Sequence, residues 1–318
     1  MPLCTPGSWL YRRASLSWLS DPALIRQLPR LYRLFACYCA APGYHPIGAE
    51  ALLRGVIAME RLTSLRDGII PLHIGEFNVF LDLWDPRFLR IPLELSETPR
   101  LLNYFLKPGD TFIDAGANHG TFSIVAAGLV GTEGLVVAIE PQPRLAGLLR
   151  KLLAQGPSRF QVHQMACGQY SRDAADFYIP AATSGSASLF PDYSARCHHR
   201  SIQVATRTLD ELIDWRRLTG RTFIKLDIEG SELSCLLGAR QLIRAAAPTL
   251  MLEINPSAMR GAATTKTALV ETLLHLGYER FVTPDQLELP RSLTNEVQDG
   301  DVIVLPESPK PSGRAHCL

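Results

Sequence analysis

Residues 111–120, which read TFIDAGANHG, contain the strongest local signal in this sequence. A short apolar run beginning at Thr111 leads into a turn with Gly116 and Gly120, and an apolar segment of helical length begins at Thr121. Glycines let the backbone turn sharply and approach a ligand closely, and a helix N-terminus offers free N–H groups to an anion. The stretch therefore predicts a strand, a ligand-binding turn and a helix.

Similar apolar runs follow along the chain, separated by segments of helical length. They are Leu135–Ile139, Phe160–His163, Thr222–Leu226 and Thr249–Ile254. Alternation of strands and helices at this spacing predicts a parallel, doubly wound sheet. A helix at 265–276, closed by Gly277, and strands at 278–282 and 302–305 would complete it. We therefore predict an α/β fold with a seven-stranded Rossmann-like sheet that has one reversed edge strand.

Weaker patterns lie around this sheet. Residues 77–83 and 88–91 are predicted as two short strands, and residues 98–106 as a helix that stops at Lys107. A long insert, 167–218, contains strand-like pieces at 176–179 and 201–205 around a small-residue stretch at 183–188. We expect this insert to overhang the site.

Charged residues follow the apolar runs where parallel strands would end. Lys225, Asp227 and Glu229 share one face of a strand with a period of two, and Glu253 and Asn255 repeat the arrangement on the next strand. Such charges are costly in a buried strand unless they lie at its carboxyl end, where α/β sheets bind ligands. The pattern favours a polar site at that edge.

The glycine spacing distinguishes two ligand classes. A dinucleotide turn has the pattern G-x-G-x-x-G, whereas this sequence has Gly116 and then Gly120, preceded by Asp114. Glu140 ends the second strand, where an acid can accept hydrogen bonds from both ribose hydroxyls. The spacing is that of an S-adenosylmethionine (SAM) turn, in which Asp114 would serve the methionyl amine directly or through water. A nicotinamide-dependent oxidoreductase on the same fold is the less favoured alternative.

These segments together resemble the FkbM family of SAM-dependent methyltransferases over residues 77–305. The resemblance is carried by Lys107-Pro-Gly-Asp110, Asp114-x-Gly-Ala-Asn-x-Gly120, Glu140-Pro141, Thr208-Leu-Asp-Glu-Leu212, Lys225-Leu-Asp-Ile-Glu-Gly-Ser-Glu-Leu233 and Gly238-Ala239. It implies a class I SAM methyltransferase fold and methyl transfer to a hydroxyl of a sugar, glycan or polyketide-type product. The cofactor-binding residues are expected to be Asp114, Gly116, Ala117, Asn118, Gly120, Glu140, Pro141 and Ala166.

Asp227 is the expected catalytic residue, with Lys225 and Glu229 setting its charge state. Glu253, Asn255 and His198 are expected to contact the acceptor, and a base in the insert, His198 or His199, is the alternative to Asp227. Asp227, Glu229 and Glu253 could supply oxygen ligands to a divalent ion. The resemblance implies no metal, so we assign no metal site from the sequence. A chain that binds SAM without turnover would be expected to have lost this polar edge.

The composition indicates a folded protein without a nucleic-acid partner. The 318 residues are 47% hydrophobic and 20% charged, and the net charge of +1 gives no basic footprint. Seven scattered cysteines and the absence of a long apolar run near the N-terminus lead us to expect a cytoplasmic protein without a transmembrane segment. We divide the chain into a helical N-terminal extension, 1–70, with its clearest helix at 49–61; a methyltransferase domain, 71–306; and a tail, 307–318. The sequence does not indicate the oligomeric state.

Overall fold

The computed structural model describes Tyr32, Gly55, Val56 and residues 67–180, 184–191, 199–218, 220–294 and 297–306. Of the predicted helix 49–61, only Gly55 and Val56 belong to this set, and both are helical. The remaining residues of that helix, most of the predicted extension 1–70, His198 and the tail 307–318 lie outside the described residues.

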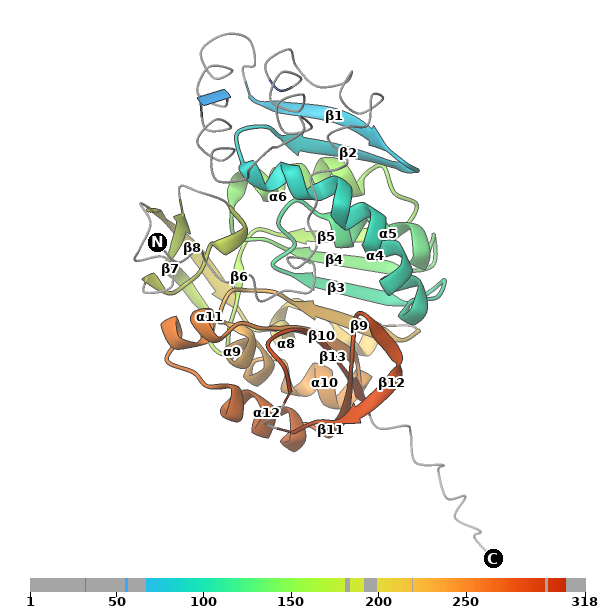
Figure 1. The fold of residues 1–318 in the computed structure, drawn as a ribbon, viewed down its shortest axis with the longest axis vertical. Helices are drawn as coiled ribbons and strands as arrows, with labels where there is room; N and C mark the ends of the chain where they lie inside the picture. Colours follow the sequence, from blue (N-terminus) through green and yellow to red (C-terminus); the bar gives the residue numbers. More distant parts are fainter. Residues whose placement is uncertain are drawn as a thin grey trace, which may run out of the picture.

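A mixed sheet of eight strands forms the centre of the protein, in the order β12-β11-β13-β10-β9-β3-β4-β5 (Figure 1). Its strands are β3 (Thr111–Ala115), β4 (Leu135–Ile139), β5 (Arg159–His163), β9 (Thr222–Leu226), β10 (Thr249–Ile254), β11 (Tyr278–Thr283), β12 (Gln286–Ser292) and β13 (Gly300–Pro306). Strands β5, β4, β3, β9 and β10 are parallel, and β13 is antiparallel to both β10 and β11. The predicted α/β class and its five parallel strands are confirmed.

The predicted number of strands and the place of the reversed strand are wrong. Strand β13, the reversed strand, lies inside the sheet, between β10 and β11. Strand β12 adds an eighth strand at the edge, antiparallel to β11. It escapes sequence-based prediction because it is polar and almost wholly exposed, and because Pro290 interrupts it, as edge strands tolerate.

Helices cover both faces of the sheet, and alternate strand residues supply two cores. Phe112 and Phe223 face one core with helices α4 (Ile91–Phe105), α5 (Thr121–Val130) and α6 (Pro143–Leu153). Ile113 and Ile224 face the other. That second face carries α8 (Leu209–Leu212), α9 (Glu232–Leu237), α10 (Arg240–Ala246), α11 (Pro256–Gly261), α12 (Lys266–His275) and the short turn η6 (Trp215–Arg217). Each large apolar side chain buried in this way contributes about 1.5–3 kcal/mol.

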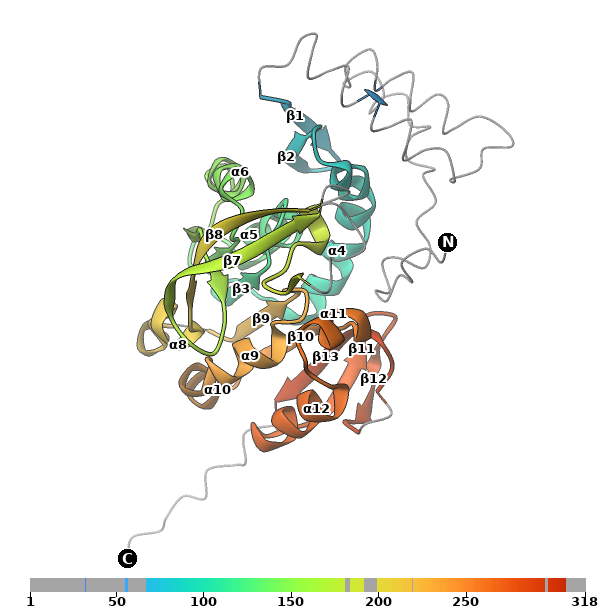
Figure 2. The ribbon, with the colours of Figure 1, turned by 90° about the vertical axis from the view of Figure 1, so that its left-hand side faces the viewer.

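A smaller sheet, in the order β6-β8-β7, comes from the insert between β5 and β9. It consists of β6 (Ala166–Cys167), β7 (Arg172–Pro180) and β8 (His199–Arg207), and the short turn η5 (Ser184–Ser186) follows β7. The predicted pieces at 176–179 and 201–205 are confirmed as parts of β7 and β8, which form an antiparallel pair. Figure 2 shows this pair lying across one end of the central sheet, as expected of an overhanging insert.

The segment before β3 contains a hairpin, β1 (Ile69–Ile74) and β2 (Phe77–Asp82), and then the 3-10 turn η4 (Pro86–Arg90). The predicted strand at 88–91 is wrong: these residues complete η4 and begin α4. Pro86 occupies the first turn of η4, and the Asp85 side chain accepts a hydrogen bond from Arg87 N, so the chain starts a helix here. The helix predicted at 98–106 accordingly begins earlier, at Ile91.

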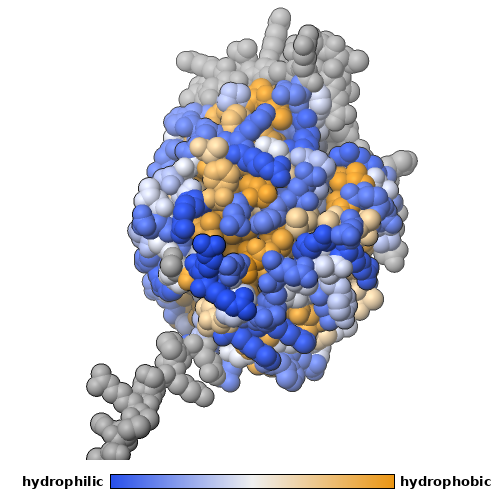
Figure 3. Space-filling model, turned by 180° about the vertical axis from the view of Figure 1, so that it is seen from behind, coloured by the Kyte–Doolittle hydropathy of each residue, from blue (hydrophilic) through white to orange (hydrophobic). Residues whose placement is uncertain are grey.

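The surface is hydrophilic over most of the face seen in Figure 3, with apolar residues grouped near its middle. The exposed large apolar side chains within the described ranges are Tyr104, Phe160, Tyr170, Leu274 and Leu289. No helix in the described part of the chain is long and apolar enough to cross a membrane.

Candidate functional site

The glycine turn after β3 packs directly against the end of β9. Gly116 has a φ of +78°, and a β-carbon there would lie 2.0 Å from the carbonyl oxygen of Asp227. Gly120, with a φ of +83°, starts α5, and a β-carbon there would lie 2.6 Å from Leu149 Cδ2. A side chain at Gly116 would clash with backbone, whereas one at Gly120 would have to displace the ends of two leucine side chains. Both positions use a backbone conformation that favours glycine.

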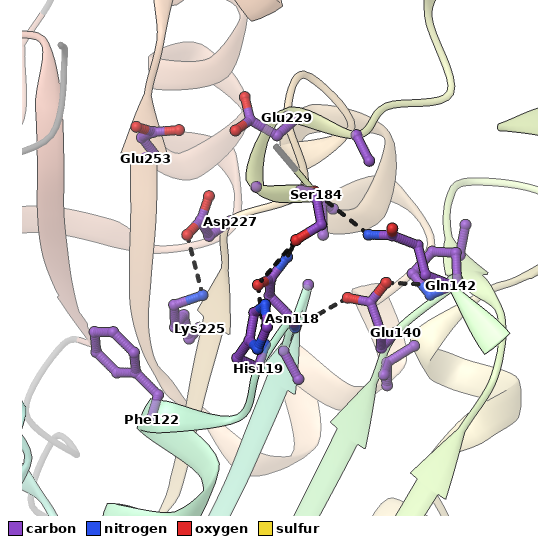
Figure 4. Close-up of a pocket in the computed structure, with 18 of the residues that line it drawn as sticks. Asn118, His119, Phe122, Glu140, Gln142, Ser184, Lys225, Asp227, Glu229 and Glu253 are labelled. Carbon is purple, nitrogen blue, oxygen red and sulfur yellow. Dashed lines mark hydrogen bonds and ion pairs between the residues drawn. The ribbon is translucent and has the colours of Figure 1, made fainter. Parts of the chain in front are cut away.

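The turn is also tied to the acid at the end of β4. Asn118 N donates to Glu140 Oε2 and Gln142 N donates to Glu140 Oε1, both at 2.9 Å (Figure 4). Burial raises the pKa of Glu140 to about 7, against the opposing effect of these N–H donors. A carboxylate has about four lone-pair sites, so Glu140 keeps capacity for further donors from a ligand.

A cavity with about 1110 Å³ of empty space, part of it open to solvent, lies between this turn, the strand ends and the insert. Six of the expected cofactor residues line it: Gly116, Ala117, Asn118, Glu140, Pro141 and Ala166. Lys225, Asp227, Glu229 and Glu253 line the same cavity, so the fold brings the expected cofactor and catalytic residues together. Phe177, Ala187 and Leu189 contribute apolar walls from the insert.

Asp114 and Gly120 are not among the lining residues. Asp114 is fully buried behind the cavity wall, where its Oδ2 accepts from Ser123 Oγ at 2.6 Å and its Oδ1 lies 3.5 Å from Lys225 Nζ. Burial raises the pKa of Asp114, although Lys225 and Ser123 oppose this rise. Its carboxylate therefore contacts Lys225 and Ser123, and a role toward a ligand amine stays a prediction.

Lys225 joins two carboxylates inside the protein. Its Nζ lies 3.2 Å from Asp227 Oδ2 and 3.5 Å from Asp114 Oδ1, and 5.1 Å from the centre of the Phe122 ring. Burial by itself would lower the pKa of Lys225, but the charges of Asp227 and Asp114 raise it above its ordinary value. Lys225 is therefore a fixed cation that orients Asp227 (Figure 4).

Three carboxylates meet beside Lys225. Asp227, Glu229 and Glu253 each offer an oxygen, and these oxygens all lie within 4.8 Å of one another. Glu229 has a φ of +50°, unusual for a residue with a side chain. Burial, and then the charges of Glu229 and Asp227, raise the pKa of Glu253 well above its ordinary value.

Glu232 holds the loop that presents this cluster, a role the sequence did not reveal. Its carboxylate accepts from Ile228 N at 3.0 Å and from Gly230 N at 3.0 Å. Burial raises the pKa of Glu232 to about 7, against these N–H donors. An acid two and four residues beyond the bound N–H groups is the local signal that could have identified Glu232 as a loop cap.

A hydrogen-bonded pair that the sequence did not reveal, His119 and Asp85, links the glycine turn to the segment before α4. His119 Nε2 hydrogen-bonds Asp85 Oδ2 at 3.1 Å, and Asp85 Oδ1 accepts from Ser184 N at 3.3 Å. Burial opposes ionisation of Asp85, but the hydrogen bond and charge of His119, followed by Ser184 and Arg87, lower its pKa to about 2. Asp85 therefore connects η4, the glycine turn and the insert. In the sequence, the Asp-Pro pair at 85–86 was the signal that could have predicted the start of a helix at this position.

The expected acceptor residues do not all meet at the cavity. Glu253 lines it, whereas Asn255 caps α11 by accepting from Ser257 N at 3.1 Å and Ala258 N at 3.3 Å. His199 begins β8, is exposed and packs edge-on against Tyr178. His198, the other histidine of the pair, lies outside the described residues.

A parallel sheet with a glycine turn after β3, an acid at the end of β4 and charged residues at the end of β9 defines the class I SAM-dependent methyltransferases, whose cofactor is SAM. The model of the methyltransferase FkbM domain matches residues 114–280, more than half of the sequence. The chain belongs to the FkbM methyltransferase family. A comparison with curated proteins finds no match.

Several solved structures are similar to the chain. The methyltransferase FkbM from Methylobacillus flagellatus is 19% identical, with a TM-score of 0.36; the match covers 69% of this chain and only 55% of that one. A SAM-dependent methyltransferase from Aquifex aeolicus is 14% identical, with coverages of 69% and 92% and a TM-score of 0.36. Aeropyrum pernix fibrillarin, solved with natively bound SAM, is 12% identical, with coverages of 66% and 74% and a TM-score of 0.33.

Proposed function

We propose that this protein is a SAM-dependent O-methyltransferase that methylates a hydroxyl of a sugar, glycan or polyketide-type product. The observation that carries the proposal is that the Lys225–Asp227 ion pair and Glu140 line one cavity. Glu140 can bind the nucleoside part of a cofactor, and Asp227 can accept a proton in the same cavity. The family resemblance supports the acceptor class.

The residues present fit SAM at the glycine turn. Glu140 keeps acceptor capacity for the two ribose hydroxyls, and Pro141 and Ala166 offer wall surface beside it. The carboxylates at the ends of β9 and β10 suit a cationic sulfonium. When bound, SAM supplies a methyl group on a positively charged sulfur.

Asp227 is the proposed proton acceptor. It would take the proton of the substrate hydroxyl, so that the hydroxyl oxygen could attack the methyl group that SAM would supply. Lys225 orients Asp227, and Asp114 in turn holds Lys225 from behind the wall. Positioned acid–base groups typically contribute about 10² to 10⁴ in rate.

Recognition of the acceptor is proposed to involve residues 1–70 and the insert at 183–200. The expected cofactor residues lie outside both segments, and the described insert residues Ala187 and Leu189 line the cavity. Tyr32, in the N-terminal segment, donates its hydroxyl to Leu83 O at 2.5 Å and packs edge-on against Phe88.

Calorimetric titration with SAM, S-adenosylhomocysteine and NAD tests the cofactor, and a SAM-consumption screen over glycans and macrolides tests the reaction. Binding of both SAM and S-adenosylhomocysteine without NAD, together with turnover on a hydroxylated acceptor, supports the proposal. Binding of NAD without SAM would favour the oxidoreductase. SAM binding with no turnover on any acceptor would favour a non-catalytic role.

A further inference from the structure

Four carboxylates converge where β9, β10 and β13 approach the cavity. Asp227, Glu229, Glu253 and Asp301 all line it, and Lys225 is the cation in ion-pair contact with Asp227. Lys225 is also in ion-pair contact with Asp114, so two carboxylates share its charge. Arg87 and Arg90 line the same cavity, but both are in ion-pair contact with a further acid, Glu94.

Glu253 is a buried carboxylate of this group. The residue is only 9% exposed, and no hydrogen bond or ion pair joins its carboxylate to another of the residues that the structure describes. Its oxygen lies within 4.8 Å of those of Asp227 and Glu229, so it is directed into the cluster (Figure 4). A buried carboxylate without a donor is costly unless a ligand compensates it.

The sheet adds to this repulsion. In the antiparallel pairing of β10 with β13, Glu253 lies directly opposite Asp301. Like charges at directly opposite positions destabilise a sheet, although the charges of Lys225, Arg87 and Arg90 favour ionisation of Asp301. The pairing of Glu253 with Asp301 therefore adds a second acid beside the one carboxylate of the cluster that has no partner among the described residues.

We propose that Asp227, Glu229 and Glu253 bind one divalent cation of the kind that prefers oxygen ligands. The sequence offered these three acids as possible oxygen ligands and the family resemblance implied no metal; the spacing of the oxygens and the buried, unpartnered Glu253 are what favour the site. Ca²⁺–oxygen distances of about 2.3–2.6 Å place opposite ligands roughly 4.6–5.2 Å apart, and Mg²⁺ places them about 4.0–4.2 Å apart. The spacing of up to 4.8 Å suits the larger ions directly and Mg²⁺ after a small inward shift.

Protonation is the competing way to relieve the repulsion. The pKa of Glu253 is raised well above its ordinary value, and burial followed by the charge of Asp227 raises that of Asp301 to about 7. A proton removes one negative charge, whereas a divalent cation neutralises two and binds several carboxylates at once. Direct cation binding distinguishes the two.

The test uses the full chain, dialysed against EDTA and then into chelator-free buffer, and titrated with MnCl₂. Calorimetry and the electron paramagnetic resonance signal of free Mn²⁺ report binding, and Mg²⁺ and Ca²⁺ are used as competitors. We expect one Mn²⁺ per chain, displaced by Ca²⁺ or Mg²⁺. Glu253→Gln and Glu229→Gln, which keep side-chain size, should each weaken binding at least tenfold. Glu271→Gln, on an exposed residue of α12, is the matched control and should bind as the native protein does.

Thermal unfolding with and without Mn²⁺ provides a second measurement, which still applies if a substitution lowers the stability of the fold. Mn²⁺ should raise the Tm of the native protein and of Glu271→Gln, but not that of Glu253→Gln. Absence of stoichiometric Mn²⁺ binding, or equal binding by native protein and both cluster variants, would overturn the site. A SAM titration in EDTA separates the two proposals. If the protein binds SAM but not Mn²⁺, only the proposed cation site is contradicted. If it binds Mn²⁺ but not SAM, only the proposed methyltransferase function is contradicted.

Discussion

Gly116 and Asp227 are in backbone contact: a β-carbon on Gly116 would lie 2.0 Å from the carbonyl oxygen of Asp227. The first residue belongs to the turn after β3, and the second follows β9, its neighbour in the sheet. The turn proposed to hold the cofactor and the residue proposed to accept a proton are therefore positioned by one contact.

Gly116→Ala should disturb both ends of the cavity. The substitution adds a backbone clash and places alanine at a φ of +78°, so we expect a loss of stability on the order of 1–3 kcal/mol together with weaker SAM binding. Gly147→Ala in α6 is the matched control, because nothing lies within 4 Å of the place that the added β-carbon would take. Alanine in a helix interior should be neutral or stabilising by about 0.5–1 kcal/mol. Urea unfolding measures both. Equal unfolding midpoints for the two variants would refute the contact argument.

Glu140→Ala should weaken SAM binding by about 1–3 kcal/mol, because ribose hydroxyls would lose their acceptor. Calorimetric titration at constant pH measures the change. An unchanged affinity in a folded variant would mean that the acid of β4 does not contact the ribose.

The pH dependence of Glu140 provides a separate test. Its folded-state pKa of about 7 lies above the ordinary 4.5, so its contribution to stability is complete below pH 4.5 and is lost as the pH rises through 7. SAM affinity should change in the opposite direction between pH 6 and 8, because the ionised carboxylate accepts more hydrogen bonds. Glu140→Gln should flatten this part of both profiles. Native-like profiles in the variant would assign the titration to another group.

Asp227→Asn should lower kcat at least tenfold while SAM affinity and Tm stay near native values. The amide keeps the size of the side chain but cannot accept a proton as a carboxylate does. Single-turnover methyl transfer and SAM titration are the measurements. Survival of turnover in this variant, with its loss in His198→Ala or His199→Ala, would place the base in the insert.

Asp85→Asn tests the pair that joins η4 to the glycine turn. The pKa of Asp85 is lowered to about 2 from 3.8, so its stabilisation is present above pH 4 and is lost as the pH falls toward 2. A shift of this size corresponds to about 2 kcal/mol. Urea unfolding at pH 6 should show native protein more stable than Asp85→Asn, with the difference shrinking at pH 3. The exposed Asp285→Asn is the control, and an equal effect of both substitutions would remove the role of Asp85.

Local patterns were sufficient for much of the fold. The apolar runs at 135–139, 222–226 and 249–254 became β4, β9 and β10 with the predicted bounds, because buried parallel strands are continuous apolar segments ended by polar residues. The turn glycines and Glu140 were found in the same way. Each of these signals depends on residues close together in the sequence.

Tertiary packing decided which side chains meet. Asp85 and His119 are 34 positions apart, and Glu253 faces Asp301 only because β13 inserts antiparallel beside β10. Asp114 lies in β3, just before the turn as predicted, yet it faces Ser123 and Lys225 behind the cavity wall. Sequence periodicity specifies the face of a strand but not the partner across it. The sequence by itself therefore determined the parallel sheet, the turn and the acids at the strand ends, whereas only the folded chain determined how those charges are paired.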